Sequence, residues 1–357
     1  MMQGRGDLET HSGDARLSVA GVSSDPNVER MIQMILGFWV SQIVYAVARY
    51  SIADELAKGP ATAAHIAEQQ ATHPDATFRL LRACASLGLV TADAQMQFAS
   101  TSLLATLRRD APGSLRGFAL ASGAPGFWRP WGRLIDAVQT GERQTVAALG
   151  KELWDYYAGA PAEAEAFTNN MNGMTEVAAR EAVLVIDTWS SMVAVDVGGA
   201  GGVLLHALME ANSKLNGILL DLPNVIEQAK ADVRWHGMEQ RFSAVGGNFF
   251  ESVPRADLYL LKWILHDWDD ASCVQILRNC SQAMHQGGRV IVIEFALDQM
   301  NQLGLAPLMD LCMMIVTGGR ERTVDEYSEL FAAAGLRLVK ATPINNPRLI
   351  IMEAVRV

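Results

Sequence analysis

Basic residues are scarce in this chain relative to acidic ones. The 357 residues contain 29 Lys and Arg against 39 Asp and Glu, and the formal net charge is -10 at pH 7. Proteins that bind nucleic acid neutralise phosphates with clustered Lys and Arg. The charge balance therefore argues against a nucleic-acid partner.

Cysteine is also rare, and its spacing fits neither a metal site nor a redox pair. Cys84, Cys273, Cys280 and Cys312 form no Cys-x-x-Cys pair and no zinc-binding pattern. Thiols stay reduced in the cytosol. We expect four free cysteines in a cytoplasmic protein.

Long apolar runs are the third feature that the sequence lacks. No run is expected to span a bilayer, and the first residues have no apolar core of a signal peptide. We therefore expect no membrane association. Residues 1–25 are rich in Gly, Ser and Asp and are expected to be disordered. The remaining chain, in a protein with 50% hydrophobic residues, is long enough for two domains.

The most informative stretch is Val193–Leu205, which reads as a strand, a glycine turn and the start of a helix. Residues 193–197 are apolar apart from Asp196, as in a strand buried on both faces. Four glycines between positions 198 and 202 allow a tight turn and close approach of the backbone to a ligand. The following helix N-terminus offers free N–H groups to an anionic group.

A second apolar run, residues 216–220, ends in Asp221, which lies 25 positions after Asp196 (221 − 196). At about this spacing an α/β nucleotide-binding unit presents a carboxylate to a ribose diol. The dinucleotide fingerprint Gly-x-Gly-x-x-Gly does not fit, because Ala200 and Val203 occupy two of its glycine positions. A cofactor with a ribose and an amino-acid tail but no pyrophosphate fits better, which indicates S-adenosylmethionine.

The chain beyond residue 186 alternates strands and helices, which predicts a parallel, doubly wound sheet. Residues 262–267 follow one of these strands directly, so we expect them at the carboxyl edge, where α/β sheets bind their ligands. The predicted strands are 193–197, 216–220, 242–245, 257–261, 290–295, 336–341 and 349–355.

The region before residue 186 is predicted to be mostly helical. Residues 28–56 form one long helical segment that is apolar on more than one face, so it is buried in its own core or against a partner subunit. Residues 61–90 resemble a helix-turn-helix, and 90–100 a short β wing. A DNA-binding winged helix is one interpretation, but its second helix offers only Arg79 and Arg82. We favour a dimerisation module, and divide the chain into domains 26–185 and 186–357.

Aromatic and Met side chains gather in the helical middle of the chain. Residues 127–131, 154–157 and 167–171 carry Phe, Trp, Tyr and Met. Each of these side chains taken singly is expected to pack in a core. As a group they could line an apolar pocket for a flat ligand.

Five motifs in a fixed order give the chain a family resemblance. They are Asp196-Val-Gly-Gly, Asp221-Leu-Pro, Gly247-Asn-Phe-Phe, His266-Asp-Trp-Asp-Asp and Gly318-Gly-Arg-Glu-Arg-Thr. Over about residues 28–355 the chain resembles the plant-type small-molecule O-methyltransferases, which include caffeic acid, hydroxyindole and bacterial antibiotic or phenazine methyltransferases. The resemblance implies a homodimer with an N-terminal winged-helix dimerisation domain and a Rossmann-like methyltransferase domain. It also implies methyl transfer from S-adenosylmethionine to a hydroxyl of a small aromatic or heteroaromatic metabolite, with S-adenosylhomocysteine as product and no metal.

The resemblance also implies roles in binding the cofactor. Gly198 and Gly199 would face its methionine part, and Asp221 would accept hydrogen bonds from the ribose hydroxyls. Asn248 and Phe249 would flank the adenine, and Lys262 would lie beside the cofactor. The chain departs from the family pattern twice: Ala200 replaces a third glycine, and Asn248 replaces an Asp, which removes a charge but keeps a carbonyl acceptor.

For catalysis, the resemblance makes His266 the general base, with Glu294 and Glu321 as the acids that orient it. A sulfonium is already a strong electrophile, so the enzyme has to align the acceptor and remove the proton of a poorly ionised phenol. On the residues alone, other interpretations stay open: His266 as a cap of a strand end, Glu294 as a salt-bridged structural acid, and Glu321 as a solvated residue paired with Arg320 or Arg322. The residues near family substrate-pocket positions are Trp131, Met171, Asp267, Met313 and Met314.

Three classes of function stay open at this level. The first is O-methylation. The second is N-methylation of an aromatic heterocycle, or a relative that binds S-adenosylmethionine without methylating, as hydroxylases and decarboxylases do. The third is a ligand-binding regulator that uses the winged helix on DNA. The intact His266 favours methyl transfer, while the sequence leaves the acceptor open.

Overall fold

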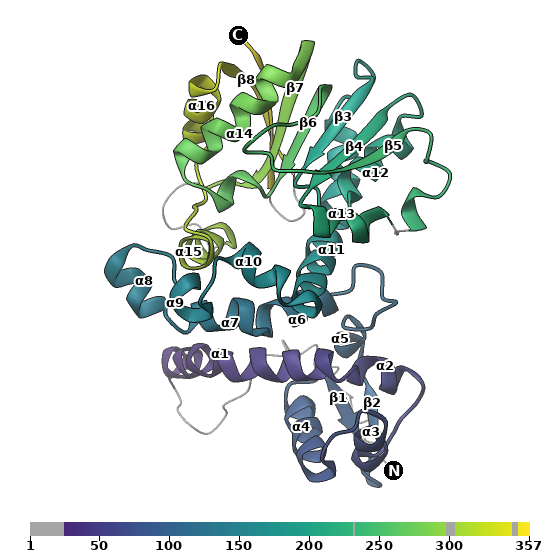
Figure 1. The fold of residues 1–357 in the computed structure, drawn as a ribbon. Coiled ribbons are helices and arrows are strands. Elements are labelled where there is room, and N and C mark those ends of the chain that lie inside the picture. The colour runs from purple at the N-terminus through teal and green to yellow at the C-terminus, as the bar shows by residue number, and fades with distance from the viewer. Residues whose placement is uncertain (1–24, 231–232, 298–303, 345–348) are drawn as a thin grey trace, which may run out of the picture. The chain divides into compact units, whose positions relative to one another are not determined.

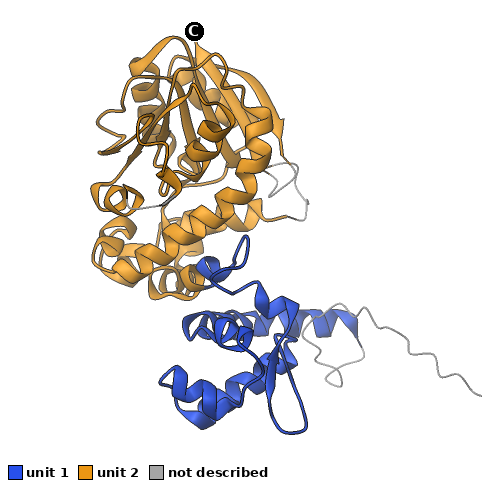
Figure 2. Cartoon of the chain, turned by 90° about the vertical axis from the view of Figure 1, so that its right-hand side faces the viewer, with its two compact units in different colours: residues 1–119 blue, residues 120–357 orange. Residues whose placement is uncertain are grey.

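The computed structural model describes residues 25–230, 233–297, 304–344 and 349–357. The predicted disordered segment 1–25 therefore lies outside the described residues, apart from Asp25. The chain divides into two compact units, residues 1–119 and 120–357 (Figure 2). The boundary predicted at 185/186 falls inside the second unit, where a helix leads directly into the first strand of the large sheet.

The first unit is helical with one short hairpin. Its core is made by apolar side chains such as Val47, Ile52, Ile66, Leu81 and Phe98. The two predicted helices and the short strands after them are present. The elements are α1 (Pro26–Arg49), α2 (Ile52–Ala57), α3 (Ala63–Gln69), α4 (Pro74–Ser86), β1 (Val90–Ala92), β2 (Phe98–Ser100) and α5 (Ser102–Ala105), while α6 (Arg116–Gly123) crosses into the second unit.

The segment predicted as one helix over 28–56 is two helices. Asp25 caps α1 through a hydrogen bond from Asn27 N at 2.8 Å, and Pro26 sits where no N–H is needed. Ser51 breaks the segment, because its backbone is left-handed with φ of 49°. By length and composition α1 passes the test for a membrane span, which corrects the prediction that no run is long enough.

In the second unit, a group of helices precedes the large sheet. They are α7 (Pro125–Trp131), α8 (Leu134–Thr140), α9 (Thr145–Leu149), α10 (Leu153–Ala158) and the long α11 (Pro161–Val185). Helix α11 packs against the sheet unit through Ala178, Ala179 and Ala182, which share a buried cluster with Leu204 and Leu208.

The sheet has seven strands in the order β5-β4-β3-β6-β7-β9-β8 (Figure 1). Strands β3 to β7 are mutually parallel, whereas β9 is antiparallel to both of its neighbours. The predicted parallel, doubly wound sheet is therefore present in β3 to β7, and the prediction needs correction only for β9, which is antiparallel to its neighbours. The strands are β3 (Val193–Val197), β4 (Asn216–Asp221), β5 (Phe242–Gly246), β6 (Ala256–Lys262), β7 (Met284–Phe295), β8 (Leu336–Pro343) and β9 (Leu349–Arg356).

Helices cover both faces of this sheet (Figure 1). Along β6, Leu258 and Leu260 face one buried cluster, and Tyr259 and Leu261 the other, as the two-residue period of a strand requires. The first cluster includes side chains of α11, α12 (Val203–Ala211) and α13 (Pro223–Lys230), and the second those of α14 (Asp270–Ala283) and α16 (Val324–Ala333). The remaining elements are α15 (Ala306–Val316) and two 3₁₀ turns, η1 (Val233–Trp235) and η2 (Leu265–Asp267).

Strand order fixes where a ligand can bind. β3 pairs with β4 on one side and with β6 on the other, so the connections leave it in opposite directions. In open α/β sheets the crevice for ligands lies outside the carboxyl ends of the strands at such a switch point. The glycine turn, Asp221 and residues 262–267 all follow strands at this edge.

Candidate active site

A cavity of about 490 Å³ opens at the carboxyl ends of β3, β4 and β6. Its volume lies in the range of small-molecule sites. All of the predicted cofactor-binding residues line it, and so do two of the predicted substrate-binding residues, Met171 and Asp267. The predicted cofactor residues are Gly198, Gly199, Asp221, Asn248, Phe249 and Lys262.

The glycine turn has little room for side chains. Gly198 is left-handed, with φ of 68°, and a Cβ there would lie 2.5 Å from the Ile264 side chain. A Cβ on Gly199 would collide with the carboxyl of Asp196. Only glycine satisfies these positions, so the backbone itself forms the wall of the cavity. This is a cradle suited to a ligand that approaches the main chain closely.

Ala200, the departure from the family pattern, keeps the turn in shape at a conformational cost. Its φ is 51°, a left-handed value that a non-glycine residue adopts at a cost of roughly 1–2 kcal/mol. Two side chains hold this strained backbone. Ala200 N donates to Asp221 Oδ2 at 2.8 Å, and Gly201 N donates to Asn172 Oδ1, on α11, at 3.2 Å.

Asp221 is a partly buried carboxylate at the end of β4. Besides Ala200 N, it accepts a hydrogen bond from Leu222 N at 2.7 Å, through Oδ1. Burial raises its pKa, and these two N–H donors oppose the rise. Each carboxylate oxygen has further acceptor capacity, so Asp221 can still receive the two donors of a ribose diol.

Lys262 brings a partly buried amine to the cavity wall. Its Nζ lies 3.2 Å from the centre of the Trp263 ring. Burial lowers its pKa to about 7, against the attraction of Glu294 and Asp196. Trp263 is itself left-handed, with φ of 55°, so the chain turns sharply where β6 ends.

Asn248 and Phe249, which follow β5, also line the cavity. Asn248 Oδ1 accepts from Phe250 N at 3.0 Å, and Asn248 Nδ2 lies 3.4 Å from Glu251 Oε1. The amide is therefore already engaged with its own loop. The Phe249 ring packs edge-on to Trp268, at 6.1 Å between centroids.

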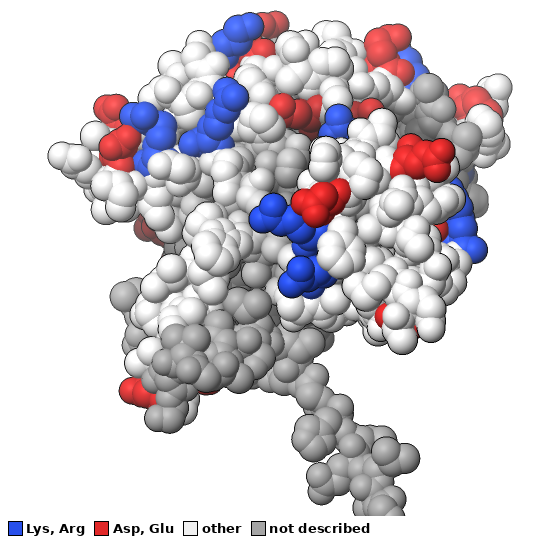
Figure 3. Space-filling view, turned by 90° about the horizontal axis from the view of Figure 1, so that it is seen from below, with Lys and Arg blue, Asp and Glu red and all other residues white. Residues whose placement is uncertain are grey.

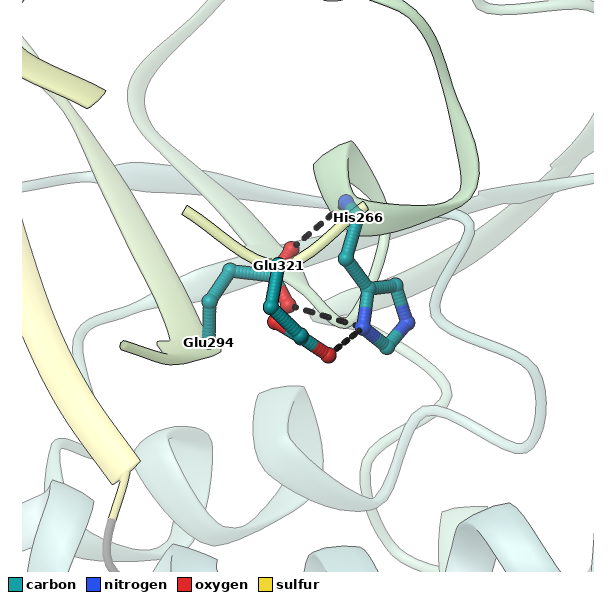
Figure 4. Close-up of side chains that lie close together, drawn as sticks. All are labelled: His266, Glu294 and Glu321. Atoms are coloured by element: carbon teal, nitrogen blue, oxygen red, sulfur yellow. Dashed lines mark hydrogen bonds and ion pairs between the residues drawn. The ribbon is translucent and has the colours of Figure 1, made fainter. Parts of the chain in front are cut away.

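His266, Glu294 and Glu321 form one buried group (Figure 4). His266 Nδ1 lies 2.7 Å from Glu321 Oε1 and 3.5 Å from Glu294 Oε2. The interpretations of Glu321 as a solvated residue and of its pairing with a neighbouring Arg are wrong, because Glu321 is 1% exposed and bonds to His266. His266 Nε2 has no hydrogen-bond partner among the described residues. His266 itself is not among the residues that line the cavity, whereas its neighbour Asp267 is.

Glu294 also fixes the backbone that carries the histidine. Its Oε1 accepts from Ile264 N at 3.0 Å, Leu265 N at 2.9 Å and His266 N at 3.4 Å. These are the free N–H groups at the start of η2, and a carboxylate satisfies them as a cap does. Glu294 thus hydrogen-bonds to the main chain of residues 264–266 and forms an ion pair with the His266 ring.

The charges of this group change its proton affinities. Burial disfavours the imidazolium, but the charges of Glu294 and Glu321 outweigh burial and raise the pKa of His266 to about 10. Burial raises the pKa of Asp267 to about 6, and its carboxylate lies 4.0 Å from His266 Nε2. A cation bound in the cavity would lower the pKa of His266, because like charges repel.

Aromatic side chains of α10 and α11 complete the cavity. Trp154, Tyr157 and Phe167 line it together with Met171, as the grouping of aromatics in the sequence predicts. The Tyr157 and Phe167 rings lie 5.3 Å apart. This wall offers flat, apolar surface opposite the polar cofactor half.

Comparison with known proteins decides the family. The O-methyltransferase domain model matches residues 131–337, and the O-methyltransferase dimerisation domain model matches residues 32–107. The chain belongs to the O-methyltransferase family.

Its relatives act on several small molecules. The chain is 34% identical to a phenazine O-methyltransferase of Lysobacter antibioticus over 88% of this chain and 92% of the relative. It is 32% identical to the mitomycin biosynthesis 6-O-methyltransferase of Streptomyces lavendulae, over 90% and 93% of the two chains. A solved O-methyltransferase of neocarzinostatin biosynthesis, bound to S-adenosylmethionine and 2-hydroxy-5-methyl naphthoic acid, has a TM-score of 0.78 and 33% identity over 89% of this chain and 96% of that one.

These findings confirm that the chain is an S-adenosylmethionine-dependent O-methyltransferase with a Rossmann-like fold. The cavity fits this cofactor on its own evidence, since it combines a glycine cradle, a carboxylate at the end of the second strand and a volume of about 490 Å³. The roles of the individual residues remain predictions.

The remaining substrate-pocket predictions are not placed on the cavity wall of this methyltransferase. Met313 is buried in an apolar cluster, and Trp131 and Met314 pack against that cluster. Trp154, Tyr157 and Phe167 belong to the same cluster and also face the cavity. Contact of Trp131, Met313 and Met314 with a substrate stays a prediction.

The sequence reading missed several residues of this site. Asn172 holds the glycine turn from α11, and Trp263 carries the left-handed bend. Arg322 is fully buried and bonds to the carbonyls of Leu265 and Trp268, which flank His266 and Asp267. The sequence could have indicated Arg322, because this residue lies inside the Gly-Arg-Glu-Arg-Thr motif. It could not have indicated Asn172, since its partner lies 29 residues away in the sequence.

Proposed function

We propose that this enzyme methylates a hydroxyl group of a small aromatic or heteroaromatic metabolite, with His266 as the general base. One observation carries the proposal. The ring of His266 is held through Nδ1 by two buried carboxylates, so Nε2 is the nitrogen free to take a proton beside Asp267, which lines the cavity. The names of the relatives, which include phenazine and naphthoate O-methyltransferases, support an aromatic acceptor.

In this mechanism the protein aligns the acceptor and handles a proton. When bound, S-adenosylmethionine supplies an electrophilic methyl group on a sulfonium. The aromatic wall would hold the acceptor ring, while His266 Nε2 accepts the proton of the hydroxyl as its oxygen attacks. Glu321 and Glu294 stabilise the imidazolium that forms. A positioned base of this kind contributes typically ~10²–10⁴-fold.

The charge of the bound cofactor would make His266 available as a base. In the protein alone the raised pKa keeps the ring protonated at neutral pH. Positive charge in the cavity would lower that pKa, which favours loss of the proton where the methyl donor is bound. His266 would therefore be able to accept a proton in the same complex that holds the methyl donor.

We propose that catalysis needs no metal. The donor atoms of His266, Glu294 and Glu321 lie within 4.8 Å of one another, a geometry that could in principle hold a divalent ion. A hydrogen bond of 2.7 Å from Nδ1 explains the same arrangement without one. Activity should survive dialysis against a chelator, and its recovery only after addition of a divalent metal would contradict this part of the proposal.

We propose a homodimer whose interface includes α1. Met34, Ile35, Phe38 and Trp39 are each more than half exposed in the single chain. Apolar surface of this extent usually marks an interface rather than bulk solvent contact. The match of residues 32–107 to a dimerisation domain supports a subunit interface over a membrane span for this helix.

We further propose a cytoplasmic enzyme without a nucleic-acid partner, with the segment after α2 as a structural winged helix. On the face drawn in Figure 3, basic side chains of the described residues lie beside acidic ones. A phosphate-binding surface needs a basic patch instead. A gel shift with genomic fragments should show no binding.

The test of the proposed function is a methyl-transfer assay with defined acceptors. Purified protein and isotopically labelled S-adenosylmethionine are incubated with a panel of phenols and matched ring-nitrogen compounds, and products are identified by mass spectrometry. Labelled methyl ethers from the phenols are expected, and His266→Gln should lower kcat by about 10²–10⁴-fold with cofactor binding intact. Methylation of ring nitrogens alone, with His266→Gln fully active, would refute the proposal in favour of N-methylation.

A further inference from the structure

The guanidinium of Arg322 lies in the interior beside the segments that carry His266 and Glu321. Its side chain is 0% exposed. A buried charge is strongly unfavourable unless its hydrogen-bonding groups are satisfied. The contacts of Arg322 therefore show what holds it there.

All five N–H donors of the guanidinium have acceptors. Nε and Nη2 donate to Asp270 Oδ1 at 3.0 and 2.7 Å, and Nη2 also donates to the carbonyl of Trp268 at 2.8 Å. Nη1 donates to the carbonyls of Leu265 and Arg320, each at 3.2 Å. Three of the five bonds thus go to main-chain carbonyls.

The three carbonyls belong to residues that are close in sequence to His266 or to Glu321. Leu265 and Trp268 bracket His266 and its neighbour Asp267, while Arg320 immediately precedes Glu321. One planar group therefore spans from the backbone of the base to the backbone of the acid that orients it. The fork of Arg is rigid, so it fixes relative positions and not only charge.

The same residue is tied to the strand that carries Glu294. Leu297 N donates to the carbonyl of Arg322 at 3.0 Å, and Ala296 and Arg322 form a parallel bridge just beyond the end of β7. Arg322 is thus anchored to all three segments of the buried group.

The segment that carries Glu321 also packs closely against the segment that carries His266 at Gly319. A Cβ there would collide with the carbonyl of His266 and with the backbone of Asp267. The two segments therefore touch main chain to main chain at Gly319 and are bonded through a side chain at Arg322. Between these two points the Glu321 carboxylate meets His266.

We propose that Arg322 is a positioning residue for methyl transfer, which sets the geometry of His266 relative to Glu321 without contacting the substrate or cofactor. This inference rests on the proposed role of His266 as base. It follows from a fully bonded guanidinium that joins the two segments and does not line the cavity.

Arg322→Lys is the informative variant, because it keeps the charge and loses the fork. An ammonium has three donors and no planar geometry, so it cannot hold all of these acceptors. Misplacement of a catalytic group by about 1 Å lowers rates by about 100-fold. We expect kcat to fall by about 10- to 100-fold, while the Kd for S-adenosylhomocysteine, measured by calorimetry, stays within about twofold of wild type.

Arg320→Gln is the matched control. Arg320 lies on the same turn and bonds to the same Asp270, through Oδ2 at 3.4 Å, but its side chain is 49% exposed. Exposed ion pairs contribute little. This variant should keep wild-type kcat.

Asp270→Asn serves as a second variant, which keeps the guanidinium fork of Arg322 and removes the carboxylate that pairs with it. The Asp270 side chain is 57% exposed, and its substitution weakens two of the five bonds of Arg322, so folding of this variant is checked by circular dichroism as well. We expect a fall in kcat of about 2- to 10-fold with unchanged cofactor affinity. If Arg322→Lys fails to give a folded protein by circular dichroism, this variant decides, and wild-type kcat in Asp270→Asn overturns the proposal.

A direct readout separates positioning from general destabilisation. In ¹⁵N-histidine NMR spectra, the His266 signals are assigned by their loss in His266→Gln. A lower His266 pKa in folded Arg322→Lys supports the proposal, because the carboxylate no longer lies at bonding distance. If Arg322→Lys keeps both the wild-type His266 titration and the wild-type kcat, the proposal is overturned. It is also overturned if kcat and the affinity for S-adenosylhomocysteine fall by the same factor. If His266→Gln is fully active, the proposed function fails, and the NMR titration still decides the role of Arg322.

Discussion

Replacing Glu321 by Gln tests the base mechanism, because the change should lower both the pKa of His266 and the maximal rate of methyl transfer. The change removes a negative charge 2.7 Å from His266 Nδ1 and keeps a carbonyl that can accept from it. A hydrogen bond to a charged group is worth about 1.5–3 kcal/mol. At about 1.4 kcal/mol per unit, the pKa of His266 should fall by about 1–2 units from its raised value of about 10.

The direction of each effect on the rate follows from the proton balance. A base acts only when deprotonated, so the rising limb of the kcat–pH profile marks the pKa of His266 in the cofactor-bound enzyme. In Glu321→Gln this limb should move to lower pH by about 1–2 units. The plateau should fall by at most about 10- to 100-fold, because the imidazolium formed in the transition state is less stabilised.

The assay is a pH–rate profile with a saturating phenol acceptor, run beside a ¹⁵N-histidine titration. Glu329→Gln, an exposed substitution on α16, is the control and should leave both profiles as in wild type. A Glu321→Gln profile with neither a shifted limb nor a lower plateau would show that Glu321 does not act through the histidine. A lower plateau without a shift would assign Glu321 an orienting role alone.

Further predictions concern the cofactor and the subunit interface. Asp221→Ala should weaken S-adenosylhomocysteine binding by roughly 1.5–3 kcal/mol, since a charged hydrogen-bond partner is lost, and unchanged affinity in calorimetry would contradict its placement. Asn248→Asp should bind this ligand at least as tightly as wild type, while a large loss would show that the loop depends on the amide bonds to Phe250 and Glu251. Trp39→Glu, on the exposed face of α1, should shift the protein from dimer to monomer in analytical ultracentrifugation. A dimer of undiminished stability would place the interface elsewhere.

Local sequence patterns were enough to predict which residues gather at the carboxyl edge of the sheet. A buried strand, a glycine turn and a helix start are local features, and each carboxylate or amide that follows a strand is carried to the same edge by the parallel topology. For this reason Gly198, Asp221, Asn248 and Lys262 meet around one cavity as predicted. The family motifs added the prediction that His266 is the base, a role that residue type and spacing alone left open.

Tertiary structure decided what depends on long-range contacts or on strand direction. Alternation of side chains is the same in parallel and antiparallel strands, so nothing local indicated that β9 runs against its neighbours. A left-handed Ser51 inside an apolar helical pattern was equally invisible. Periodicity could not sort the aromatic and Met side chains between cavity and core either, because both surroundings are apolar.

The pairing of His266 with Glu321 is the clearest case of a contact that only the tertiary fold creates. His266 and Glu321 are 55 residues apart, and their carboxylate–imidazole bond exists because two loops dock at Gly319. The five bonds of Arg322 arise from the same docking. The cost of burying these charges is offset only by partners that the folded chain brings together, so no local pattern in the sequence could reveal them.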